Sequence, residues 1–148
     1  MKAMNTEEKK ALVETMKAQH AQLALDLEEL RVLATGEAPE RAAIVAGLAR
    51  FSAHLAEHLE LEDGTFYPAY IAQKRQLGED TERVTQYMKE MQVIAKAVSV
   101  FVASALPEGV ETAEAVARFI PQLKRISQML AVRVETEEEG PYEKFLAE

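Results

Sequence analysis

The chain has 148 residues, of which 48% are hydrophobic and 28% are charged, and its net charge is -8 at pH 7. This length and composition suit one globular domain with a buried core, so we expect a single domain over residues 1–148. The acidic excess argues against nucleic-acid binding, which depends on Lys and Arg contacts to phosphate. No apolar run has the length that a bilayer requires, so we expect no membrane segment.

The remaining composition excludes several classes of active site. The chain contains no cysteine, which rules out a disulfide framework and a thiolate nucleophile. It shows no Gly-rich phosphate loop and no nucleophile–base arrangement, so we expect a protein that is not an enzyme. The first ten residues, MKAMNTEEKK, lack the apolar segment of a secretory signal, which favours a cytoplasmic location.

The first predicted helix begins at a cap formed by Asn5 or Thr6 and ends near Thr35 and Gly36. His20 lies on its apolar stripe. The apolar members of that stripe, at three- and four-residue spacing, are Leu12, Val13, Met16, Leu23, Leu27 and Leu30.

The second predicted helix has Pro39 in its first turn. Asp63 and Gly64 interrupt its pattern, but apolar and aromatic residues continue beyond them. We therefore expect one helix with a distortion towards Pro68 and an end around Gly78. The inward stripe consists of Ile44, Leu48, Phe51, Leu55, His58 and Glu62.

The third predicted helix starts near Glu79 or Asp80 and ends before Pro107. The fourth runs from about Val110 to the C-terminal region, with a kink at Pro121. No segment shows the alternating pattern of a strand. Four long helices with short connections predict an all-α fold, an antiparallel up-down-up-down four-helix bundle.

A candidate site lies on the second predicted helix. His58 and Glu62 stand four residues apart, and His54 precedes His58 by one turn. Such residues project from one face of a helix, here the apolar face, where a polar group is costly unless it is hydrogen-bonded or binds a metal. The pair is either a set of metal ligands or a hydrogen-bonded pair in a polar core layer. His54 is either a further ligand or a group that supports one.

The fourth helix repeats the second at an offset of 75 residues. The matched pairs are Leu48 with Leu123, Phe51 with Ile126, Leu55 with Leu130, Glu62 with Glu137, and Tyr67 with Tyr142. The first and third helices align less well. The polar centre is only half repeated, because His58 is matched by Arg133 and His20 by Met91.

With these motifs the chain resembles the hemerythrin-like, or HHE cation-binding, family over nearly its whole length. The resemblance rests on His20 within AQHAQL, on His58 and Glu62 within HLELEDGTFYP, and on Glu137 within RVETEEEGPY. It implies a four-helix bundle in which histidines and glutamates from the helices hold two irons bridged by carboxylates. Members of the family bind oxygen, respond to nitric oxide, or sense iron and oxygen.

The chain departs from the family pattern at two positions. Arg133 stands where the fourth helix would offer a histidine, and Met91 or Glu90 occupies the position on the third. Arginine has no lone pair for a metal, and methionine sulfur is a poor ligand for hard cations. A buried guanidinium would repel a second cation and could pair with Glu137 or Glu62. We therefore expect one metal ion rather than two.

Our first hypothesis is a metal-binding module that holds one transition metal through His20, His58, Glu62 and Glu137. Iron is favoured, although manganese and zinc also suit these ligands. Its role would be the sensing, storage or transport of oxygen, nitric oxide or the metal itself.

The second hypothesis is a metal-free bundle in which Arg133 pairs with Glu62 and Glu137, and which acts as a dimerising or partner-binding module. Di-iron oxidation chemistry is the least favoured interpretation. We also expect residues 135–139 to be a solvated helix end with only Glu137 turned inward. Tyr67 and Tyr142 are expected to pack at the edge of the core.

Overall fold

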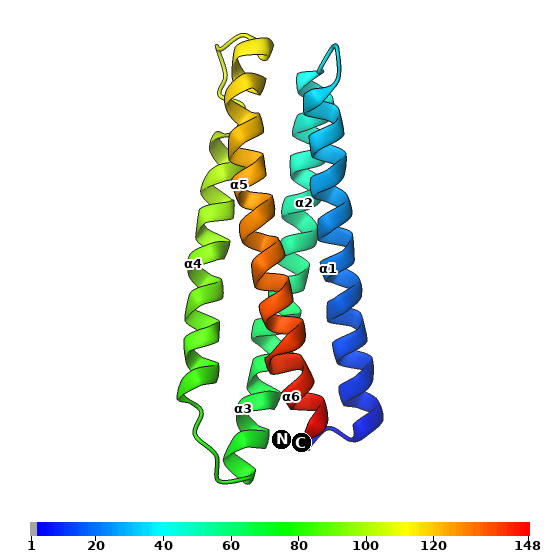
Figure 1. Cartoon of the computed structure of the whole chain (residues 1–148), viewed down its shortest axis with the longest axis vertical. Coiled ribbons are helices and arrows are strands. Elements are labelled where there is room, and N and C mark those ends of the chain that lie inside the picture. Colours follow the sequence, from blue (N-terminus) through cyan, green and yellow to red (C-terminus); the bar gives the residue numbers. More distant parts are fainter. Residues whose placement is uncertain (1–2) are drawn as a thin grey trace.

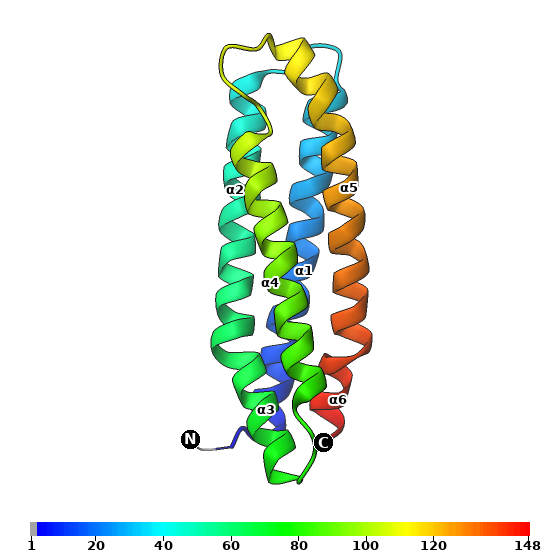
Figure 2. The ribbon, with the colours of Figure 1, turned by 90° about the vertical axis from the view of Figure 1, so that its left-hand side faces the viewer.

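The computed structural model describes residues 3–148, and four long helices run the length of an elongated bundle (Figure 1). They are α1 (Thr6–Thr35), α2 (Arg41–Leu61), α4 (Glu82–Ser104) and α5 (Thr112–Glu139). Each long helix runs opposite to the one before it, and α1 lies between α2 and α5, behind α4 in Figure 2. The predicted all-α, up-down-up-down bundle is therefore confirmed. Among the described residues, no helix is both long and apolar enough to cross a membrane.

The start of α1 is fixed by a local hydrogen-bonded cap. The Glu8 N–H donates to Asn5 Oδ1 at 2.9 Å, and the Asn5 N–H donates to Glu8 Oε1 at 3.2 Å. This reciprocal pair satisfies two backbone donors that an uncapped helix would leave free. Of the two caps predicted from the sequence, the structure uses Asn5.

The predicted distortion of the second helix is a π-helical turn, η1 (Glu62–Phe66), which leads directly into α3 (Tyr67–Gln76). The Tyr67 N–H donates to the Glu62 carbonyl, five residues back. A π turn accommodates one more residue than an α turn and so rotates the residues after it about the helix axis. The side chains of Phe66 and Tyr67 are consequently both fully buried, on the same interior as Glu62.

The fourth helix differs from one continuous helix at its C-terminal end. The α5 helix stops at Glu139, and a short helix, α6 (Pro141–Ala147), comes after it. The Gly140 N–H still donates to the Thr136 carbonyl at 3.0 Å. Pro141 has no N–H to extend that ladder, so the chain changes direction. The break lies at the position that the 75-residue repeat matches to the π turn.

The core consists of two apolar clusters with buried polar side chains between them. The cluster towards the C-terminal end of α1 includes Leu23, Leu27, Leu30, Phe51, Leu55, Met91, Phe119 and Leu130. The cluster around α3 and α6 includes Leu12, Met16, Phe66, Tyr67, Tyr70, Val84, Tyr142 and Phe145. The buried polar layer between them contains His20, His58, Glu62, Arg133 and Glu137.

Candidate metal centre

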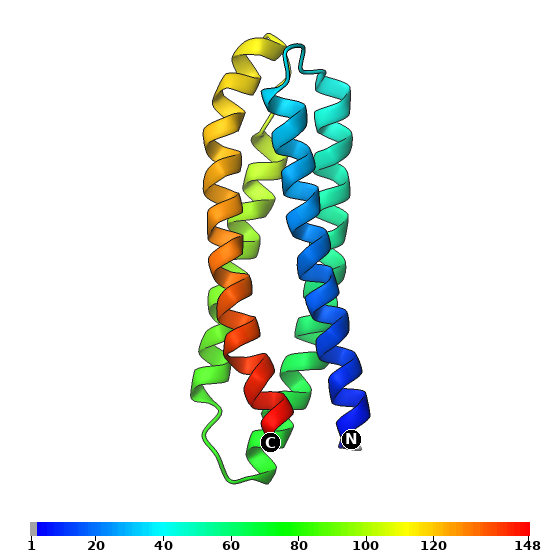
Figure 3. The ribbon, with the colours of Figure 1, turned by 45° about the vertical axis from the view of Figure 1, so that its right-hand side comes forward.

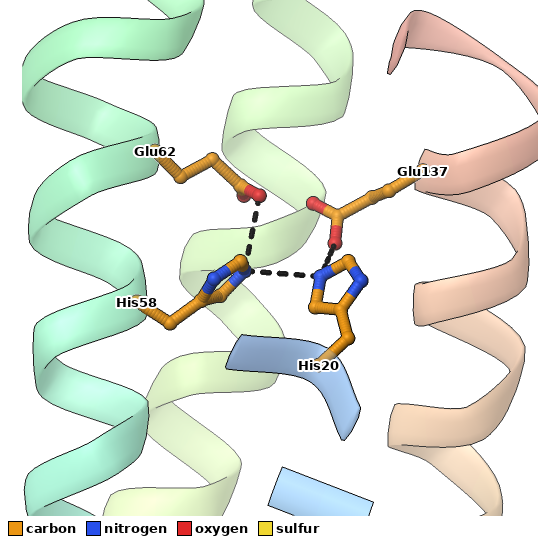
Figure 4. A group of neighbouring side chains, drawn as sticks. All are labelled: His20, His58, Glu62 and Glu137. Atoms are coloured by element: carbon orange, nitrogen blue, oxygen red, sulfur yellow. Dashed lines mark hydrogen bonds and ion pairs between the residues drawn. The ribbon is translucent and has the colours of Figure 1, made fainter. Parts of the chain in front are cut away.

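Four side chains from separate helical segments meet in this polar layer (Figure 4). His20 comes from α1, His58 from the end of α2, Glu62 from the start of η1, and Glu137 from α5. Each can offer one ligand atom, and these four atoms lie within 4.8 Å of one another. All four side chains are at most 4% exposed. This group contains every metal-ligand candidate that the sequence predicted, except His54.

The two imidazoles meet through their Nε2 atoms, which are 3.1 Å apart. His58 Nδ1 lies 2.8 Å from Gln19 Oε1, and His20 Nδ1 lies 2.7 Å from Glu138 Oε2. Both partners offer acceptor oxygens, so the tautomer with the ring protons on Nδ1 directs both Nε2 lone pairs towards each other. In that tautomer the two facing lone pairs repel each other, and a metal cation bound between them would remove this repulsion.

The glutamates complete this group from the opposite side. Glu62 Oε2 lies 3.2 Å from His58 Nε2, and Glu137 Oε1 lies 3.2 Å from His20 Nε2. The other oxygen of Glu62, Oε1, is buried without a hydrogen-bond partner. An unpaired buried carboxylate oxygen is costly, and a bound cation would satisfy it.

Each carboxylate also accepts a hydrogen bond from a tyrosine of the other half of the repeat. The Tyr142 hydroxyl donates to Glu62 Oε2 at 2.8 Å, and the Tyr67 hydroxyl donates to Glu137 Oε2 at 3.5 Å. Burial, together with the charges of Glu62 and Glu137, raises the pKa of both tyrosines, so they remain protonated donors. The prediction that they only pack at the core edge was incomplete.

The two carboxyl groups differ in their protonation. Burial and the adjacent charge of Glu62 raise the pKa of Glu137 well above the usual range. Burial acts in the same direction on Glu62, but hydrogen bonds from His58, Glu137 and Tyr142 outweigh it and keep the pKa of Glu62 below its usual value. Of the two carboxyl groups, Glu137 is therefore the one that more readily carries a proton. A bound metal cation would favour the ionised form of both groups.

Arg133 lies beside this group and is itself 5% exposed. Its Nη2 donates to the Tyr67 hydroxyl at 3.2 Å and to the Tyr87 carbonyl at 2.7 Å. Its Nε lies 3.5 Å from Glu137 Oε2, and its Nη1 lies 3.5 Å from Glu90 Oε2. Of the two predicted partners, the guanidinium pairs with Glu137.

The third helix contributes no ligand to the four-residue group. Met91 is buried in the apolar cluster, and the half-exposed carboxylate of Glu90 is directed to Arg133. His54 also lies outside the group. Its Nδ1 is 2.6 Å from Oδ2 of the buried Asp26, whose Oδ1 accepts from Gln22 at 3.0 Å. His54 therefore bridges α2 and α1, one turn away from the group.

Two supporting residues were not predicted from the sequence. Glu138, expected to be solvated, is about one-third exposed and contacts His20 Nδ1 through its carboxylate. Gln19, which immediately precedes His20, contacts His58 Nδ1 through Oε1. Helical periodicity places neither residue on the inward stripe, so no pattern in the sequence indicates these contacts.

Two imidazole nitrogens and two carboxylate oxygens form a ligand set that suits iron, manganese or zinc. Two nitrogens that each lie about 2.1 Å from one ion can be 3.1 Å apart, as the Nε2 atoms are here. The residues present therefore fit a bound transition metal.

Comparison with known proteins agrees with this geometry. Residues 11–145 match the family model described as the hemerythrin HHE cation binding domain. Searches of curated proteins and of solved structures found no match for the chain. The matched range includes all four residues of the group and both halves of the repeat. The chain therefore belongs to the hemerythrin HHE cation-binding domain family.

Proposed function

We propose that this chain is a non-enzymatic module that holds one transition metal ion, iron in preference to manganese or zinc. His20, His58, Glu62 and Glu137 would be its ligands. The observation that carries the proposal is the pair of Nε2 atoms 3.1 Å apart on rings whose Nδ1 atoms contact the acceptor oxygens of Gln19 and Glu138. Support of a histidine ligand through its other nitrogen is typical of metal sites.

One ion is favoured over two because the second half of the repeat offers a cation in place of ligands. Arg133 takes the position that the repeat matches to His58, and it pairs there with Glu137. Arginine keeps its proton in proteins, so this charge is permanent and repels a second metal ion nearby. The site then resembles a half-occupied two-cation centre in which one cation belongs to the protein.

Iron held by these residues would supply a site for reversible binding of oxygen or nitric oxide, which suits sensing, storage or transport of a small ligand or of the metal. The chain's contribution is to orient the ligands and to exclude water. The hydroxyls of Tyr67 and Tyr142 donate towards the group, and apolar clusters close it on both sides.

Metal content per chain, measured by mass spectrometry on untagged protein reconstituted with iron(II), tests the proposal. We expect about one ion per chain. An ultraviolet-visible spectrum in air distinguishes the outcomes, because two irons with an oxo-bridge band would contradict the role given to Arg133. A chain that remains empty after reconstitution would contradict the metal site itself.

The contacts of Arg133 favour a second candidate, a metal-free bundle that acts through its surface. The guanidinium has four polar partners, and a buried charge persists only when it is paired. In that case a chelator would leave the melting temperature of the isolated protein unchanged. A metal-loaded protein would instead lose stability as its ion is removed.

A further inference from the structure

A large cavity lies between α1 and α5, the two helices at the front of Figure 3. Its volume is about 610 Å³, within the range of pockets that bind small organic molecules. The side chains along its length are mostly apolar, among them Leu23, Leu27, Leu123 and Leu130. The space greatly exceeds what a diatomic gas requires, so access of oxygen or nitric oxide to the metal group does not account for it.

The two ends of this cavity differ in chemistry. One end is lined by His20, whose other face belongs to the metal group. Towards the other end, Lys124 of α5 and Arg31 of α1 both line the wall. Residues 20 and 31 are 11 positions apart on α1, a rise of about 16 Å. The cavity is therefore a long apolar slot with cationic side chains remote from the metal group.

Lys124 is a solvent-exposed ammonium at the rim of this end. Arg31 is already paired with Glu28, which also lines the cavity. Lys124 forms no ion pair with any of residues 3–148, although the protein as a whole has an acidic excess. Ser127 and Gln128 come after it along the same wall and can donate further hydrogen bonds. An ammonium, a hydroxyl and an amide on one wall match a single carboxylate.

We propose that this cavity binds a free fatty acid of medium chain length. The carboxylate would lie at Lys124, Ser127 and Gln128, and the alkyl chain would extend past Leu27 and Leu130 towards His20. The charge of Lys124 complements an anionic head group, and the apolar slot removes the chain from water. This site goes beyond the proposed metal function and does not depend on it, because none of its anchoring residues is a metal ligand candidate.

Calorimetric titration of the full-length protein with sodium dodecanoate, below its critical micelle concentration, tests the proposal. We expect saturable one-to-one binding that weakens about tenfold in Lys124→Glu, through loss of the charge pair. The matched control is Lys89→Glu, an equal charge change on an exposed residue of α4 outside this cavity, which should leave affinity unchanged. 1-Dodecanol, which lacks the charge, should bind at least about tenfold more weakly.

A second pair of variants tests the location independently of charge. Ala131→Phe inserts a ring into the cavity wall and should abolish binding, whereas Ala97→Phe on the exposed side of α4 should not. Circular dichroism verifies that both variants are folded. Absence of saturable dodecanoate binding to the unmodified chain would overturn the proposal. Equal effects of the two glutamate variants, or of the two phenylalanine variants, would overturn it as well. Metal content is measured separately, so failure of either proposal leaves the other to its own test.

Discussion

The two halves of the repeat place similar side chains around one interior but provide different charges there. In the first half, Gln19 of α1 supports His58 of α2. In the second, Glu90 of α4 pairs with Arg133 of α5 at the matched position. The helix-to-helix contact is retained, while the side chain it supports changes from the imidazole of His58 to the guanidinium of Arg133. In our proposal the first half thus offers imidazoles to a metal cation, whereas the second half carries the permanent charge of Arg133.

This difference shows how a symmetric scaffold can hold an asymmetric site. The glutamates and tyrosines remain in matched positions, and each tyrosine donates to the glutamate of the other half. The carboxylates therefore interact with both halves, while only the first half offers imidazoles. Arg133 compensates part of the negative charge that a second metal ion would otherwise balance.

The largest effect on metal content should come from removal of two candidate ligands in the first half of the repeat. Replacing His58 and Glu62 together by alanine should reduce bound metal from about one ion per chain to none, because two of four ligands are lost. His54→Asn is the matched control, since it retains a donor for Asp26 and lies outside the group. Metal analysis after dialysis gives the result. Retention in the double variant would exclude this site.

The difference between the two halves can be tested in the opposite direction by giving the second half the histidines that it lacks. Met91→His combined with Arg133→His should raise the metal content from about one to about two ions per chain, because imidazole supplies a lone pair that guanidinium lacks. Arg133→Lys keeps the positive charge and should remain at one ion. If the double variant binds no additional metal, the second half fails for a reason other than its charge.

A smaller effect, on metal affinity, is expected when the contact between Glu138 and His20 is removed. Glu138→Leu removes the acceptor that contacts Nδ1, and loss of such a partner weakens metal affinity about ten- to a hundredfold. Glu139→Leu changes an exposed neighbour by the same chemistry and should leave affinity near the original. Competition with a chelator of known affinity measures both. Equal weakening in the two variants would indicate a general charge effect.

The smallest effect concerns the pH dependence of the free energy of unfolding of the metal-free protein. Because the pKa of Glu137 is raised by burial and by Glu62, the folded chain keeps a proton there above pH 4.5, where the unfolded chain has released it. The free energy of unfolding should therefore fall as the pH rises from 4.5 through the raised pKa. Urea unfolding at a series of pH values measures this fall, which should be reduced in Glu137→Gln. An unchanged slope in that variant would assign the pH dependence to other groups.

The sequence by itself determined the four long helices, the bundle and the group of four candidate metal ligands. Helical periodicity is local, so the spacing of His58 and Glu62 specifies a shared inward face without reference to the other helices. The repeat indicated Glu137 in the same way, and His20 lay on the stripe of the first helix. These four residues are the ones that the fold brings together.

Only the tertiary structure decided which neighbours contact these candidate ligands. Whether Glu138 reaches His20, or His54 turns to Asp26, depends on the rotation and separation of two packed helices, which no single helix encodes. The π turn changes the phase of the residues after Glu62 and turns Tyr67 towards Glu137. The cavity between α1 and α5 likewise arises from packing, because it lies between helices that are distant in sequence.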